Sequence, residues 1–163
     1  MSESVAIRER IEREVKATLE GMTGVGTVYR WTGRANINLQ HLDAVVIPEE
    51  DAIEDGAQGD TGWLHKALSL MVAVVLMPDE EATENHCALR NRWQARLEQA
   101  IANNYEMTET ATSKRLAVDT SFQSVDAPDI IDGALTVALR VIVHYEHPRN
   151  DPYTAPGVSA LVE

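Results

Sequence analysis

The feature that most constrains this chain lies near its C-terminus, in residues 134–147, where apolar side chains alternate with small or polar ones. A period of two is that of a β-strand with one face against a core. The chain must therefore build a sheet and cover one face of it with an apolar layer. The apolar positions are Leu135, Val137, Leu139, Val141, Val143 and Tyr145.

Four further segments favour strands, and the last of them is expected to pair with residues 134–147 as an antiparallel hairpin. The segment 64–77 is apolar at both alternating positions, which is typical of a central strand covered on both faces. A neighbouring subunit is one candidate for its second cover. Pro48 is expected to end the second strand. The four segments are residues 27–31, 42–47, 64–77 and 114–125.

Two segments have the apolar spacing of amphipathic helices, residues 4–20 and 79–103. With the strands, they predict an α+β fold in which a mixed or antiparallel sheet of about five strands packs with two helices. We expect one domain over residues 1–147 and an extended C-terminal tail over 148–163. The expected apolar stripes are Ile7, Ile11, Val15, Leu19 and Met22 in the first helix, and Ala82, His86, Leu89, Trp93, Leu97 and Ile101 in the second.

The charge balance argues against tight binding of nucleic acid. The 163 residues carry a formal net charge of −12, and the basic residues form no cluster. The longest apolar run, residues 68–77, is about half of what a membrane span requires, so we expect no membrane association and synthesis in the cytoplasm. Cys87, the single cysteine, is expected to be a buried, inert thiol.

No motif of a catalytic, cofactor or metal site is present, and we expect none of these sites. The sequence has no GxSxG, Walker or GxGxxG pattern. His144 and His147 end the same strand three residues apart, so their side chains should point to opposite faces. The acidic segment 49–62 does not match a calcium loop and is interpreted as a long, mobile and solvated loop.

A set of charged and aromatic residues is the candidate interaction surface. Exposed aromatic residues flanked by charge are common at interfaces, although Trp63 is explained equally well as an anchor of the loop against its own sheet. The candidates are Arg30, Trp31, Glu49, Glu50, Asp51, Glu54, Asp55, Trp63, Asp151, Pro152 and Tyr153.

The element order, together with several quotable pieces of sequence, resembles the tail terminator (tail completion) proteins of long-tailed bacteriophages of the lambda type. The most suggestive piece is a long alternating strand that ends in an aromatic residue and is followed by Asp-Pro-Tyr. The pieces are IRERIEREVK, YRW, LDAVVIPEEDA, LSLMVAVVLM, PDEEATENHCALRNRWQARLEQAI, TVALRVIVHYEH and DPYT, within residues 5–154.

The resemblance implies a structural virion protein without catalysis, cofactor or metal. Six copies would form a ring that caps the tail tube, stops its polymerisation and presents a surface to the head-completion (neck) protein. Genomic DNA would pass through the bore without specific binding. Six copies would carry 6 × (−12) = −72 charges, and a bore lined by acids would repel phosphate.

Three alternatives remain open at this stage. A head-closure or neck connector protein of the same virion is the nearest. A small cytoplasmic enzyme that uses His144 or the acidic segment is a second. An antitoxin-like or adaptor module, recognised by a single tight heterodimer, is a third.

Overall fold

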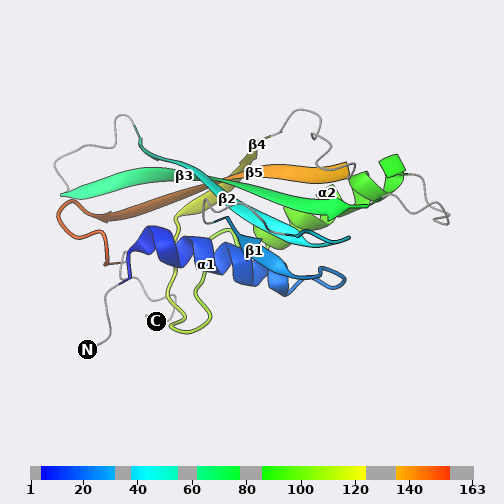
Figure 1. Ribbon diagram of the computed structural model, residues 1–163. Helices are drawn as coiled ribbons and strands as arrows, with labels where there is room; N and C mark the ends of the chain where they lie inside the picture. The colour runs from blue at the N-terminus through cyan, green and yellow to red at the C-terminus, as the bar shows by residue number, and fades with distance from the viewer. Residues whose placement is uncertain (1–4, 32–37, 55–61, 78–85, 124–134, 155–163) are drawn as a thin grey trace.

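The computed structural model describes residues 5–31, 38–54, 62–77, 86–123 and 135–154. These contain two helices and one five-stranded sheet, which is the predicted α+β fold (Figure 1). The elements are α1 (Ile7–Glu20), β1 (Val28–Arg30), β2 (Ala44–Ile53), β3 (Trp63–Leu76), α2 (His86–Ala102), β4 (Asp119–Gln123) and β5 (Leu135–Pro148).

The strands lie in the order β1-β2-β3-β5-β4. Only β1 and β2 are parallel, and the other three pairings are antiparallel. The two fourteen-residue strands β3 and β5 pair along their whole length, from Trp63 opposite Pro148 to Leu76 opposite Leu135. The predicted antiparallel pairing of the last two strands is confirmed.

Both helices pack on the same face of the sheet (Figure 1). The apolar stripe of α1 and the Trp93–Leu97–Ile101 stripe of α2 are buried against alternate residues of β3 and β5. Leu68, Leu70, Val72 and Val74 of β3 all contribute to this core. Burying such side chains stabilises the fold by about 1.5–3 kcal/mol each relative to exposure.

The described residues cover one face of β3 along most of its length and the second face only at its end. On the second face Val75 is 3% exposed, whereas Ser69, Met71 and Ala73 are half-exposed, and a neighbouring subunit remains the proposed cover for these three. The described residues thus provide no second layer over the middle of this face. One face of the sheet is therefore a core, and among the described residues the middle of the other face is open.

Strand β2 corrects a second prediction, because it continues through Pro48 to Ile53. Its partner β1 ends where Arg30 lies opposite Val46, so β2 has no strand partner on that edge beyond this point among the described residues. A proline is tolerated on a free edge, where its missing N–H leaves no strand partner unsatisfied. The pairing of β2 with β3 shifts its register between Pro48 and Glu50, as at a β-bulge, and then continues. Residues 49–53 are therefore strand, and residues 55–61 of the predicted loop lie outside the described residues.

The other predicted elements are shorter than expected or differ in part. The strand predicted over 114–125 is confirmed for Asp119–Gln123, while Leu116 and Ala117 before it are buried in irregular backbone. Residues 124–125, and the predicted helix start at 79–85, lie outside the described residues. Cys87 is exposed, contrary to the prediction of a buried thiol, because it lies off the apolar stripe of α2.

The described residues after β5 turn instead of extending. The Arg149 N–H donates to the Gly62 carbonyl at 2.8 Å, and the Ile7 N–H donates to the Pro152 carbonyl at 3.0 Å. The second contact supplies a partner to one N–H of the first turn of α1, where helical partners are lacking. Residues 149–154 therefore lie against the start of the first helix.

Candidate functional site

The open face of the sheet lies opposite the core. We define it by its half-exposed residues. Paired residues of antiparallel strands point to the same face, so the strand register identifies its members. The centre of the face is mostly apolar and small, and its charged groups are held in cross-strand contacts. The open face comprises Ile47, Ala52, Ala67, Ser69, Met71, Ala73, Ala138, Arg140, Ile142 and His144.

An ion pair crosses this face from β2 to β5, over β3. The Arg140 guanidinium donates to both oxygens of the Glu49 carboxylate, at 2.8 and 3.1 Å. The hydrogen bond to Glu49 raises the pKa of Arg140, so the guanidinium stays charged. Solvent screens an exposed pair of this kind, so it adds little to the stability of the fold. The contact orients a charge on the face more than it stabilises the fold.

A chain of three polar side chains lies near one end of the open face. His144 Nδ1 is 2.6 Å from Glu54 Oε1, and His144 Nε2 is 3.2 Å from Ser121 Oγ. Glu54 follows β2, His144 lies on β5 and Ser121 lies on the edge strand β4. The His144 and Glu54 side chains are 34% and 38% exposed, so small solutes reach both.

Asp51 lies on the opposite, helix-covered face and accepts hydrogen bonds there. The Tyr145 hydroxyl donates to both its oxygens at 2.9 and 2.8 Å, and Lys66 Nζ lies 2.9 Å away. Arg8 adds a longer contact at 3.9 Å. Burial, followed by the bond to Asp51, raises the pKa of Tyr145 well above its usual value, so its hydroxyl keeps its proton. Asp51 thus anchors β2 to β5 and α1.

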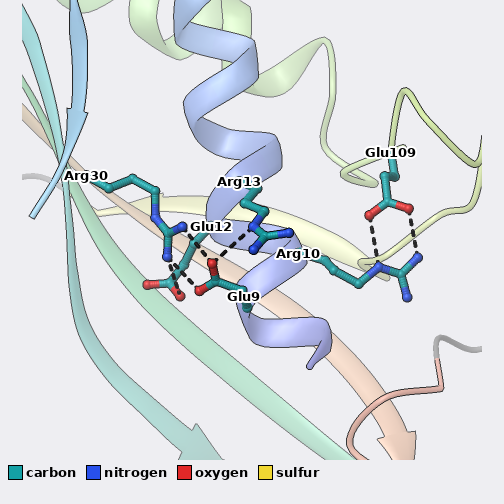
Figure 2. A network of polar contacts seen from close by, with 6 residues as sticks. All are labelled: Glu9, Arg10, Glu12, Arg13, Arg30 and Glu109. Atoms are coloured by element: carbon teal, nitrogen blue, oxygen red, sulfur yellow. Dashed lines mark hydrogen bonds and ion pairs between the residues drawn. The ribbon is translucent and has the colours of Figure 1, made fainter. Parts of the chain in front are cut away.

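Arg30 joins β1 to α1 in the network drawn in Figure 2. It donates to both oxygens of Glu9, at 2.7 and 2.6 Å, and lies 3.6 Å from Glu12. The bond to Arg30 lowers the pKa of Glu9, whereas burial raises the pKa of Glu12. Further along α1, Arg10 makes a second bidentate pair with Glu109, also seen in Figure 2. These contacts fix the helix on the sheet.

The remaining candidate residues are dispersed over the surface. Trp31 and Tyr153 are 43% and 48% exposed, and Glu50 is also exposed. Trp63 begins β3 and is half-buried opposite Pro148. Pro152 accepts the α1 hydrogen bond described above.

Asp151 caps the turn after β5. Its carboxylate accepts from the Tyr153 N–H at 3.0 Å and from the Thr154 hydroxyl. These two hydrogen bonds lower the pKa of Asp151. Asp55 lies outside the described residues.

The interpretation of the acids in residues 49–54 as solvated is wrong for Asp51, whose side chain is 9% exposed. Glu49 is exposed and Glu54 is half-exposed, but both are paired. Glu49, Asp51 and Glu54 each face a cationic or histidine partner within the subunit. Sequence reasoning missed Ser121 and the partners of these acids altogether. No local signal identifies them, because they meet only through the register of four strands.

The histidine prediction is confirmed, since His144 lies on the open face while His147 is 5% exposed on the other. Within the described ranges, no three His, Cys, Asp or Glu side chains gather as a metal site would require. No helix among the described residues is long and apolar enough to cross a bilayer. A scan of protein-family models and a search of curated proteins find no match to the chain.

Proposed function

We propose that this protein is a structural assembly protein that works by self-association, as the tail terminator of a long-tailed phage. The observation that supports this most is the one-sided sheet, whose described helices cover one face and leave the apolar centre of the other half-exposed. An exposed apolar patch of this kind is typical of a surface that another protein covers. A second copy, the tube protein and a neck protein are the proposed partners.

The sheet edges add to this proposal. β1 and β4 lie at opposite ends of the strand order, so each has one side without a strand partner in the sheet. Natural edge strands are usually protected by lysine or proline, and β4 contains neither. Val118 and Phe122 beside this edge are 53% and 37% exposed. Two unlike edges on one subunit suit a head-to-tail contact, which closes into a ring when the rotation allows it.

A ring of six copies is proposed to cap the tail tube, stop its growth and receive the head. Its acidic charge would let genomic DNA pass without binding. Since Glu49, Asp51 and Glu54 are paired within the subunit, exposed acids such as Glu50 would carry this repulsion. A ring structure with a basic bore would overturn the DNA part of the proposal.

The decisive experiment is electron microscopy of virions made without this protein. The terminator proposal predicts tails of uncontrolled, excessive length, because nothing stops tube polymerisation. Normal-length tails without heads, or leaking heads, would reject it in favour of a neck connector. Restoring the wild-type chain in trans is the control, and it should return tails of uniform length.

A further inference from the structure

Ser121, His144 and Glu54 can form hydrogen bonds to one another because small side chains lie between His144 and Glu54. His144 lies opposite Ala67 on β3, and Ala67 lies opposite Ala52 on β2. The two methyl groups leave space for the imidazole to reach across β3 to Glu54, 2.6 Å away. Ser121 approaches from the other side, diagonally across the β4–β5 pair, where it lies opposite Ile142.

The donors and acceptors of the three side chains then indicate the direction of each hydrogen bond. A carboxylate is only an acceptor, so Glu54 requires that His144 carry a proton on Nδ1. A neutral imidazole with that proton has a lone pair on Nε2. With the imidazole in this neutral form, the Ser121 hydroxyl donates to Nε2, 3.2 Å away. This polarity is the one that a general base needs in order to take a proton from a nucleophilic serine.

We propose that Ser121 is a nucleophilic serine, activated by His144 and oriented by Glu54, that reacts with small activated carboxylic esters. The Ser121 Oγ forms a bond to the ester carbonyl carbon while its proton moves to His144 Nε2. Collapse of the adduct breaks the bond to the leaving alcohol, which takes up that proton. Water then attacks the acyl-serine with His144 again as base, releasing the carboxylic acid and restoring the hydroxyl.

The position of Ser121 also limits the substrate. It lies on β4, the last strand in the described sheet order, and the backbone N–H groups on the outer side of that strand are the proposed donors to an oxyanion. The neighbouring surface consists of Ile142 and Ala67, which suits short apolar acyl groups better than long ones. The site is open to water, so acyl transfer to water is the expected outcome.

This proposal departs from the sequence-based expectation of no catalytic centre, which relied on the absence of local motifs. It goes beyond the proposed assembly function and concerns the unassembled subunit, in which the open face that carries Ser121 and His144 is accessible. Glu54 is a positioning residue in it, whereas Ser121 and His144 are catalytic residues.

The test combines a fluorophosphonate probe, located by peptide mass spectrometry, with hydrolysis of p-nitrophenyl acetate. The wild-type chain should be labelled at Ser121, and S121A should lose both the label and the ester hydrolysis above background. S69A is the matched control, since Ser69 lies on the same face on the other side of Ile142, and it should behave as wild type. H144Q should lower the rate about 100-fold, the lower bound for a general base.

Glu54 is tested by the separation of kcat from KM. E54Q should lower kcat and leave KM unchanged, while E50Q, an exposed neighbour, should change neither. Circular dichroism verifies that each variant is folded. Equal rates for wild type and S121A, or a probe adduct at another residue, would overturn the proposal.

Discussion

The two faces of the sheet are built from the same strands, yet they differ in burial and in polarity. On the helix side, alternate residues of β3 and β5 are fully buried aliphatic side chains. On the open side, most of their neighbours one position along are half-exposed, Val75 and Thr136 being buried, and polar side chains of β5 form contacts with residues in and just after β2, on the far side of β3. The helix face therefore determines whether the chain folds, and the open face is available for contacts with other molecules.

Charged side chains also have different roles on the two faces. Under α1, the Glu9–Arg30 pair and the Asp51–Tyr145 contact hold elements of one subunit together. On the open face, the Glu49–Arg140 pair and the His144 contacts leave side chains accessible to solvent. The same kind of substitution should therefore change stability by different amounts on the two faces.

The largest expected effect comes from one charge placed on either face of β5. Val141 is fully buried, so V141D should cost about 4 kcal/mol or more and leave the chain unfolded. Ile142 is the next residue and faces the open side, so I142D should cost less than about 1 kcal/mol. Chemical denaturation measures both. A folded V141D would show that the assigned strand register is wrong.

Replacing a large apolar side chain by alanine should distinguish the two faces less strongly than adding a charge does. Leu97 of α2 is fully buried, and L97A should lower the free energy of unfolding by about 2–5 kcal/mol. M71A on the open face removes side-chain atoms that are already partly in water, and it should cost under about 1 kcal/mol. Comparable losses in urea titrations would mean that the open face is packed in the monomer.

The Arg30 network should contribute more than an ordinary surface ion pair. R30A removes both bonds to Glu9 and leaves the buried Glu12 carboxylate without its nearest cation, at an expected cost of about 1–3 kcal/mol. R13A breaks only an exposed pair one helical turn along and should cost about 0.3–0.5 kcal/mol. Thermal melts of both variants check the ranking, which fails if R13A is the more destabilising.

The smallest expected effect is a dependence on pH at Glu12. Burial raises the folded pKa of Glu12 above its ordinary value of 4.5, so ionisation disfavours the folded state at neutral pH. That penalty is present above the folded pKa and absent below the ordinary one. E12Q should therefore raise Tm at pH 7, and this gain should disappear below about pH 4.

The exposed E20Q is the control and should give no gain at either pH. A gain from E12Q that is equal at both pH values would exclude the burial of charge as its cause.

Periodicity was sufficient to predict the helices, the long strands and the fold class, because burial against a core imposes its spacing on the sequence. It failed at Pro48, where the outcome depends on how far β1 extends beside β2. It failed at Cys87 because a position one step off the α2 stripe is exposed. The partners of Glu49, Glu54 and Ser121 depend on the order of four strands, and no local pattern specifies that order.

We propose that the open face is covered when copies of the chain assemble, and the molar mass measured over a range of concentrations shows whether this occurs. Sedimentation equilibrium up to high concentration should show wild type approaching six times 18.0 kDa, or about 108 kDa, and I142D remaining at 18.0 kDa while folded. Wild type that stays monomeric throughout, or an I142D variant that assembles equally well, would contradict the account.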